Sequence, residues 1–384
     1  MRAIRLILLA LLAGSTLSAQ EPEELEEADP GIPWRTSYFP YLTGGINDSP
    51  VLAARVRHWQ PAEYESRVTA TAALNLDAGV TSRGSRYFRV EFEAPELWEG
   101  WRLRTFGWLE RSARYGYFGL GNDSEKNDDL VDETDPFLYR VRRARYKVQA
   151  ELTRQLSGPL HLAFQGDAEQ VRFTSLPGPS VFGGEFPSGE LEQGDVSGRL
   201  AVVYDTRDNE YNTGQGLLLE AGAQLGSGGD GYTRLYSILR GYLSPLEGTV
   251  VALRLAGGGT GGTPPLNARF TLPGWERAVH VLGGQHSHRS FDFGRFAGRG
   301  TLIGNLEVRH DVLAFGDLGA ITLMAFVDAG RVFEEESFRL TTEDMHVGGG
   351  GGIGLRILRS TIFTLNFAGG PEGFNFSVGN GWMF

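Results

Sequence analysis

A two-residue alternation of apolar and polar side chains recurs beyond Tyr38, and it constrains the fold more than any other feature of this chain. Within 195–205 one parity is largely apolar and the other is largely polar or small: Val196, Gly198, Leu200, Val202 and Tyr204 alternate with Asp195, Ser197, Arg199, Ala201, Val203 and Asp205. Successive side chains of a β-strand point to opposite faces, so this pattern predicts strands with one apolar face and one polar face. Similar alternation occurs in 143–152, 305–311 and 363–368.

Alternation fits two architectures. In a soluble sandwich the apolar face points to a core, whereas in an outer-membrane barrel it meets lipid and the polar face lines the interior. The barrel is favoured by expected strands of about 9 to 15 residues, by aromatic residues near strand ends and by a terminal aromatic strand over 374–384. Those aromatic residues are Trp59, Trp98, Trp101, Trp108, Tyr115, Tyr117 and Phe118. We therefore predict an all-β fold, a transmembrane antiparallel β-barrel of about sixteen strands.

The expected strands are spread along the whole chain after its first forty residues. They centre near positions 41, 55, 71, 90, 106, 144, 166, 201, 221, 237, 252, 306, 326, 352, 365 and 379. Between about 256 and 300 no alternation is visible, and a connection well above about 15 residues is usually functional or disordered. We predict a long loop there, with the glycine run 257–262 as a flexible part of it.

Composition excludes several other classes. Glycine is abundant, 54 of 384 residues, but without the period of collagen, and 41% hydrophobic residues are too many for a disordered chain. The chain has no cysteine, so disulfides, thiolate metal sites and cysteine nucleophiles are excluded. A net charge of −11 argues against nucleic acid as a partner.

The N-terminus reads as an export signal. Arg2 and Arg5 precede an apolar stretch and the small residues Ser18 and Ala19, which predicts a signal peptide over 1–19. An acidic periplasmic tail is expected over 20–37, and the barrel over 38–384. The expected location is the bacterial outer membrane, with its lipid, including lipopolysaccharide where present, as surroundings.

Four short motifs follow one another in the second half of the chain. They are Asp205-Thr206-Arg207-Asp208-Asn209, His288-Arg289-Ser290-Phe291, Gly304-Asn305-Leu306-Glu307-Val308-Arg309 and Phe326-Val327-Asp328-Ala329-Gly330. In this order they resemble motifs of the outer-membrane assembly-factor superfamily, the bacterial surface antigen or BamA/TamA-like barrels. A fifth stretch, 119–124, resembles a loop of some members. The final Phe384 resembles the assembly signal of outer-membrane barrels.

The resemblance implies that the long loop folds into the lumen and that Arg289 pairs there with Glu307 and Asp328. The alternation supports this arrangement, because both acids share the polar face of their strands and a guanidinium can bind two carboxylates. The alternative is that these are three of many lumenal charges. The family motif has Val and Gly where this chain has His288 and Ser290, which argues against a positive-φ turn at 290 and leaves the position of the loop tip open.

Other chemistry has little support in the sequence. His286 and His288 lack a third metal ligand at a fixed spacing, the glycine run lacks a phosphate-loop lysine, and no Gly-x-Ser-x-Gly motif is present. We therefore expect no enzyme, metal or cofactor.

The resemblance implies a barrel that inserts or translocates client proteins at the outer membrane through a lateral seam. Family members usually carry periplasmic POTRA domains, but residues 20–37 are too few to fold as one, so we expect a member without POTRA domains that uses a periplasmic partner subunit. The alternative is a passive or loop-gated channel for small solutes.

Overall fold

The computed structural model describes residues 32–43, 50–63, 66–131, 135–335, 337–358 and 361–384, of which Trp34–Phe384 form one compact unit. The expected signal peptide lies outside these residues, as does most of the expected tail, so both stay predictions. The first strand begins at Arg35, inside the range expected for the tail.

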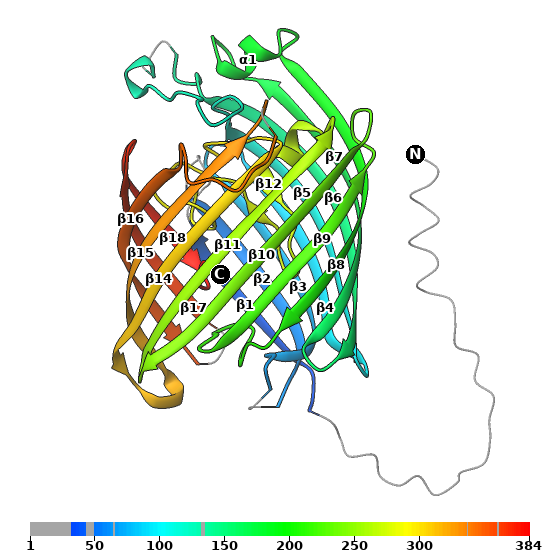
Figure 1. Cartoon of the computed structure of the whole chain (residues 1–384), viewed down its shortest axis with the longest axis vertical. Helices are drawn as coiled ribbons and strands as arrows, with labels where there is room; N and C mark the ends of the chain where they lie inside the picture. The colour runs from blue at the N-terminus through cyan, green and yellow to red at the C-terminus, as the bar shows by residue number, and fades with distance from the viewer. Residues whose placement is uncertain (1–31, 44–49, 64–65, 132–134, 336, 359–360) are drawn as a thin grey trace, which may run out of the picture. The chain divides into compact units, whose positions relative to one another are not determined.

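Sixteen strands form one antiparallel sheet that curls into a barrel (Figure 1). They are β1 (Arg35–Thr43), β2 (Val51–Pro61), β3 (Ala70–Thr81), β4 (Arg86–Trp98), β5 (Trp101–Gly116), β6 (Arg140–Ser157), β7 (Leu160–Ser175), β8 (Glu190–Asp205), β9 (Gly216–Gly226), β10 (Tyr232–Leu246), β11 (Thr249–Gly262), β14 (Gly300–Ala314), β15 (Gly319–Phe333), β16 (His346–Ile357), β17 (Thr361–Gly370) and β18 (Gly373–Asn380). Each of the sixteen expected centres falls within one of these strands, so the predicted fold class and strand number are confirmed.

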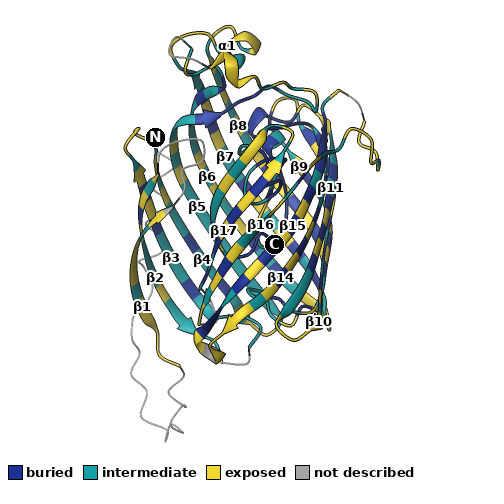
Figure 2. Ribbon diagram, turned by 90° about the vertical axis from the view of Figure 1, so that its left-hand side faces the viewer, coloured by how far each residue is buried: buried dark blue, intermediate teal, exposed yellow. Residues whose placement is uncertain are grey.

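The alternation in sequence becomes a difference between the two faces of the wall. On β8 the outward side chains of Val196 and Leu200 are 65% and 47% exposed, whereas Arg199 between them is 4% exposed and points inward. Figure 2 shows this as alternating yellow and darker bands along the strands. An apolar exterior with charged groups inside is the pattern of a barrel in lipid.

The two ends of the barrel differ in their connections. At one end lie the described parts of three long connections, 117–131 with 135–139, 176–189, and 334–335 with 337–345, and the first two contain the short helices η1 (Asp128–Leu130) and α1 (Val181–Glu185). At the other end most turns are short, and one carries η3 (Gly316–Leu318). We call these the long-loop end and the short-turn end, which face the exterior and the periplasm in outer-membrane barrels. In the part of the chain that is described, no helix has the length and hydropathy needed to cross a membrane.

The connection between β11 and β14, residues 263–299, folds into the lumen, and we call it the lumenal loop (Figure 1). It contains η2 (Leu266–Phe270) and the two-stranded sheet of β12 (Thr271–Leu272) and β13 (Val279–His280). Tyr115 and Tyr117, expected near a strand end, lie at the end of β5 and directly after it, where they are buried in a core with Phe270 of this loop.

Two strand limits differ from expectation. The glycine run 257–262 is not loop but the end of β11, paired with β10, where a Cβ at Gly258 would lie within 3 Å of Leu272 and Tyr236. Because glycine has no side chain, this end of the strand shows no alternation and could not be recognised from the sequence. The last strand ends at Asn380 rather than Phe384, because Gly381 adopts a φ of +89° and turns the chain inward.

Candidate functional site

Sheet register places the acceptors for the lumenal loop in two neighbouring rows. Asn305 on β14 pairs with Asp328 on β15 and with Arg254 on β11, so these three lumen-facing residues form one row across the strands. Glu307 pairs with Phe326 in the next inward row. The two rows together present carboxylate and amide oxygens to one point of the lumen.

Arg289 of the lumenal loop lies between the two carboxylates. Its Nε and Nη2 donate to Asp328 Oδ2 and Oδ1 at 2.9 Å each, and its backbone N–H donates to Oδ2 at 3.0 Å. Its Nη1 donates to Glu307, which also accepts from Arg309 Nε at 2.7 Å. The guanidinium carbon lies 3.3 Å from the centre of the Phe326 ring. The structure thus brings Arg289, Glu307 and Asp328 together, each at most 2% exposed, and we call them the latch.

The two departures from the family motif fit this wall. Ser290 does not adopt a positive φ, and its Oγ donates to Gly369 O at 3.0 Å while its side chain fills the space beside Gly348 and Gly370. His288 is fully buried, and its Nε2 lies 3.0 Å from the carbonyl oxygen of His346. Burial lowers the pKa of His288, which keeps the ring neutral.

A second anchor holds the turn between β12 and β13. Trp275 is 3% exposed, its Nε1 donates to Thr153 Oγ1 at 3.0 Å and its backbone N–H donates to Glu220 Oε2 at 2.7 Å. The guanidinium carbon of Arg102 lies 5.0 Å from the centre of its ring. Thr153 and Arg102 lie towards the ends of β6 and β5 at the short-turn end, so the lumenal loop reaches down to that end.

Glu276 connects this turn to the Asp-Thr-Arg-Asp-Asn motif. Arg207 binds Asp205 through Nε at 2.9 Å and Nη2 at 3.1 Å, and its Nη2 also donates to Glu276 at 2.6 Å. Arg240 Nη1 donates to the other oxygen of Glu276 at 3.0 Å. Burial raises the pKa of Glu276, but the two guanidiniums outweigh it and hold this pKa well below its ordinary value. Arg207 of the Asp205–Asn209 motif is therefore a partner of the lumenal loop, and the sequence did not indicate this contact.

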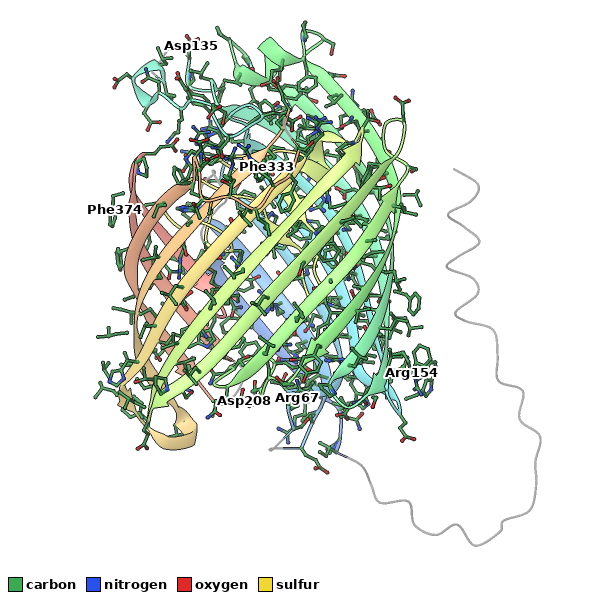
Figure 3. The ribbon with its side chains drawn as sticks, viewed as in Figure 1. Arg67, Asp135, Arg154, Asp208, Phe333 and Phe374 are labelled. Atoms are coloured by element: carbon green, nitrogen blue, oxygen red, sulfur yellow. The ribbon has the colours of Figure 1, made fainter. Side chains whose placement is uncertain are left out.

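The remaining motif residues shape the wall and the turns. Asp208 lies at the short-turn end (Figure 3) and accepts backbone N–H groups of Gly214 and Gln215 at 3.0 and 3.1 Å. Phe291 is buried in a cluster of lumenal-loop and β15 residues: Val281, Leu282, Phe296 and Val332. A Cβ at Gly330 would overlap the Leu282 side chain, so glycine permits the close approach of the loop. A Cβ at Gly304 would have only the Leu255 side chain within 4 Å.

The stretch 119–124 contacts Arg295, near the C-terminal end of the lumenal loop, at the long-loop end. Arg295 donates to the carbonyl and hydroxyl oxygens of Ser124 at 2.6 and 2.8 Å and to Glu372 at 2.7 Å. Asn122 accepts the Val332 backbone N–H at 3.0 Å. The lumenal loop is thus bound at both ends of the barrel and between them.

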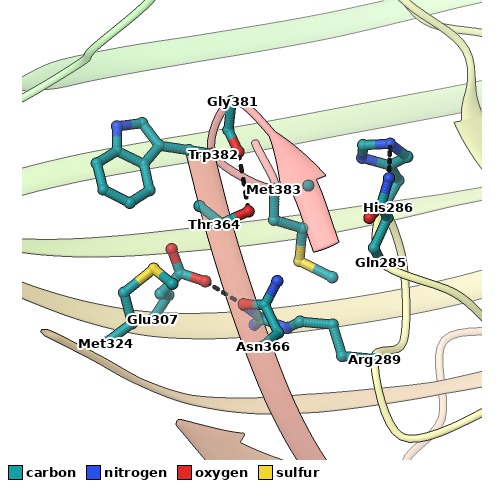
Figure 4. Close-up of a pocket in the computed structure, with 11 residues that line it drawn as sticks. Gln285, His286, Arg289, Glu307, Met324, Thr364, Asn366, Gly381, Trp382 and Met383 are labelled. Carbon is teal, nitrogen blue, oxygen red and sulfur yellow. Dashed lines mark hydrogen bonds and ion pairs between the residues drawn. The ribbon is translucent and has the colours of Figure 1, made fainter. Parts of the chain in front are cut away.

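A small polar cavity lies beside the latch and the last residues of the chain (Figure 4). It is lined by Gln285, His286, Arg289, Glu307, Met324, Thr364, Asn366, Gly379, Gly381, Trp382 and Met383. Among the described residues, no group of three or more His, Asp or Glu side chains is placed to hold a metal ion.

Phe384 does not continue the wall. Arg309 Nη2 donates to its backbone oxygen at 3.2 Å, and Arg254 faces its ring at 5.0 Å. Its expected role as an assembly signal stays a prediction.

The first and last strands form the two edges of the sheet. Within the ranges that the structure describes, no backbone pairing joins β1 to β18. Pro40 lies in β1, and proline within a sheet is confined largely to edge strands, because it lacks the N–H that a second neighbour would use. We call this pair of edges the seam; in the described part of the chain it is the place where neighbouring strands of the wall are not paired.

Several contacts of the site were missed from the sequence. Trp275 belongs to a stretch noted only as part of the loop, and the partners Arg254 and Arg295 were not distinguished from the other arginines of the chain. Arg309 ends the Gly304–Arg309 motif, but its contact with Glu307 was not predicted. Their roles depend on register and loop path, which alternation does not define.

Comparisons with known proteins agree with this architecture. Residues 71–382 match the Omp85 superfamily domain. The chain is similar in structure to BamA from Haemophilus ducreyi lacking POTRA domains 1–3, with a TM-score of 0.56 and 11% identity over 91% of this chain and 69% of that one. It is also similar to CdiB from Escherichia coli, with a TM-score of 0.58 and 11% identity over 93% and 65% of the two chains. For CdiB from Acinetobacter baumannii the TM-score is 0.53, with 14% identity over 89% and 59%.

A comparison with curated proteins found no match. At these identities the similar structures establish the fold, whereas the domain match covers most of the chain and establishes the family. The expected resemblance and the expected outer-membrane location are both confirmed: this chain is an outer-membrane β-barrel protein that belongs to the Omp85 superfamily.

Proposed function

We propose that this barrel inserts or translocates client proteins at the outer membrane through the seam between β1 and β18. The observation that carries the proposal is the backbone edge on each side of the seam, which has no ladder partner among the described residues. An exposed edge can pair with an incoming strand, because its free N–H and C=O groups lack partners in the wall. The expected partners are unfolded clients, membrane lipid and a periplasmic subunit, and no cofactor is needed.

The alternative, a passive or loop-gated solute channel, has less support. The lumenal loop is bound to the wall through Arg295 near the long-loop end, through Arg289 along the lumen and through Trp275 towards the short-turn end. A segment held in this way obstructs diffusion along the lumen. A channel would need these contacts to break, whereas a client strand could pair with the edge of β1 or β18 while these contacts stay in place.

Reconstituted liposomes test the proposal. Liposomes that contain the full-length protein should accelerate the insertion of an unfolded β-barrel client over empty liposomes, with and without periplasmic extract. Cysteine pairs, one in β1 and one in β18, should abolish the acceleration when oxidised and restore it when reduced. The natural chain has no cysteine, so each disulfide is the engineered one.

The matched control is a disulfide within an existing hairpin. Asn366 and Ser377 are register partners on β17 and β18, and the pair Asn366→Cys with Ser377→Cys should leave the acceleration unchanged. Equal rates with oxidised and reduced seam pairs, or no acceleration under any condition, contradict the proposal. Steady conductance of the unmodified protein in planar bilayers would favour the channel instead.

A further inference from the structure

The outward face of β4, β5 and β6 changes from apolar to cationic towards the long-loop end. On β4 the exposed Phe88 is followed, two residues nearer that end, by Arg86, and on β5 the exposed Leu109 is followed in the same way by Arg111. On β6 the outward Tyr146 is 56% exposed. Exposed aromatic and apolar side chains mark the border of the hydrocarbon region, and the long-loop end faces the exterior. The two arginines therefore lie at the level of the outer-leaflet headgroups.

Arg86 and Arg111 are directly opposite each other on this face. They are register partners on β4 and β5, and both are exposed. Directly opposed side chains on one face have Cβ atoms about 5 Å apart, and like charges at such positions are destabilising. The acids Glu91 and Glu110 of the same strands bind lumenal arginines instead, and neither outward guanidinium has an ion pair with a described residue. An anion bound between them would remove this repulsion.

A β-bulge brings two more arginines to the same face. The register of β5 against β6 shifts between Ser112 and Tyr115, and Tyr115 is buried against the lumenal loop. Because a bulge adds one residue to its strand, Arg114 shares the outward face with Arg111 although three positions separate them. Arg142 of β6 lies opposite the bulge, and it points outward because both of its neighbours in the strand are buried on the lumenal side.

The added arginines also lack anionic partners. The guanidinium carbon of Arg114 lies 4.9 Å from the centre of the Phe137 ring. Within the described ranges Arg142 has no ion pair, nor does the exposed Arg83 in the turn between β3 and β4. Five arginines thus gather at the long-loop end of three neighbouring strands, and we call them the arginine patch: Arg83, Arg86, Arg111, Arg114 and Arg142.

The arginine patch has a limit on each side. Towards the seam, the register partner of Arg86 on β3 is Val80, and that of Val80 on β2 is Leu52, and both are exposed and apolar. On the other side, Arg172 of β7 is compensated by Glu190 of β8 at 2.8 Å. The uncompensated positive charge is therefore confined to β4, β5, β6 and the turn before β4.

We infer that the arginine patch binds the headgroup of a phosphorylated glycolipid of the outer leaflet, such as the lipid A part of lipopolysaccharide. A guanidinium can donate two parallel hydrogen bonds to a phosphate, so two neighbouring arginines can share one phosphate. Arg111 and Arg114 are three residues apart, about 10 Å in an extended strand. The two pairs, Arg86 with Arg111 and Arg114 with Arg142, therefore suit two phosphates held apart by a disaccharide. The site lies on the outer wall and goes beyond the proposed function, on which it does not depend.

Native mass spectrometry of the full-length protein in a nonionic detergent tests the site. The probe is lipid A with two phosphates, and the comparison probes are lipid A with one phosphate and phosphatidylglycerol. The unmodified protein should bind the first probe at least about fivefold more tightly than either of the others, because each cation near an anionic headgroup contributes about a fivefold factor. Arg111→Gln should weaken binding about fivefold, and Arg86→Gln with Arg111→Gln about 25-fold.

The matched control is Arg154→Gln. Arg154 lies on the same outward face of β6, because it shares its parity with Tyr146, but at the short-turn end (Figure 3), where its Nη1 donates to Glu99 O at 2.8 Å. Its substitution should leave the affinity for lipid A unchanged. An equal loss of affinity in Arg154→Gln and Arg111→Gln would overturn the inference.

Two further results would overturn it. One is equal binding of lipid A by the unmodified protein and by the double variant, and the other is equal affinity of the unmodified protein for lipid A and phosphatidylglycerol, which shows general attraction to anionic lipid. The double variant removes a like-charge pair and should fold normally. If it does not fold, the order of the three probes on the unmodified protein decides, and equal binding of lipid A with one and two phosphates overturns the inference.

Discussion

Replacing Arg289 by alanine should release the lumenal loop from the wall. The change removes three side-chain hydrogen bonds to two buried carboxylates, and breaking a buried ion pair from one side costs about 3–5 kcal/mol. Part of the charge stays compensated, because Glu307 keeps Arg309 at 2.7 Å and Asp328 keeps Asn305 Nδ2 at 2.8 Å. We therefore expect the lower end of this range, about 3 kcal/mol, or about a 100-fold larger population of the released loop.

Limited proteolysis measures this population. Chymotrypsin should cleave after Trp275, which is 3% exposed, only when the loop leaves the lumen. When opening and closing are fast, the cleavage rate follows the open fraction, so Arg289→Ala should be cleaved about 100-fold faster than the unmodified protein. Arg289→Lys should be intermediate, because an ammonium keeps the charge but cannot bind both carboxylates in the same geometry.

The matched control is Arg104→Ala. Arg104 binds Glu91 across β4 and β5 and has no described hydrogen bond to the lumenal loop. If both variants are cleaved after Trp275 at the same rate, the latch does not hold the loop. A double-mutant cycle of Arg289→Ala with Asp328→Asn should in addition give a coupling energy of about 0.5–3 kcal/mol.

Three further changes test other contacts of the loop. Glu276→Gln should speed cleavage after Trp275 about tenfold, since Arg207 and Arg240 lose their shared carboxylate, and an unchanged rate would show that the turn is held by Trp275 alone. Burial lowers the pKa of His288, and it lowers the pKa values of His280 and His286 in the same loop to about 3, so loop packing should be complete above about pH 6.5 and weaken as the pH falls below it. Cleavage normalised to a free peptide should rise at acid pH, and His288→Gln should reduce the rise, whereas an unchanged rise would show that His288 does not contribute. Gly330→Ala should lower the free energy of unfolding by about 1–3 kcal/mol, because the added Cβ overlaps the Leu282 side chain of the loop. Denaturant midpoints measure this loss. Gly304→Ala on the outward face is the control, and an equal loss of stability in that variant would contradict the packing argument.

The pH prediction concerns a ring with few compensating neighbours. His288 Nε2 is paired with the carbonyl of His346, its Nδ1 has no hydrogen bond, and the charged groups near it are Asp328, Arg289 and the His346 ring. Asp328 favours the protonated ring, but it is already bound to Arg289. Protonation therefore adds a buried charge beside an existing cation.

The strands could be predicted because a membrane wall imposes period two on every residue that crosses it. The same rule gave the direction of Glu307 and Asp328, since each shares its face with polar neighbours. It could not give their distance from Arg289, which depends on the pairing of Asn305 with Asp328 and on the path of a loop without periodicity. Glycine has no side chain, so the glycine-rich end of β11 could not be recognised from alternation. The alternating aromatic residues at the C-terminus predicted a last strand that extends to Phe384, whereas the chain turns inward at Gly381.

The wall next to the seam has little packing of its own. Residues 348–352 of β16 are all glycine, so this stretch contributes backbone hydrogen bonds but no side-chain contacts to β15 and β17. Ser290 of the lumenal loop fills the space beside Gly348 and Gly370 and binds the β17 backbone. The loop thus supplies contacts that the strands lack, and loss of the latch should weaken β16 to β18 more than β6 to β8. Amide hydrogen exchange in Arg289→Ala separates the two cases, since faster exchange spread evenly around the barrel would contradict this coupling.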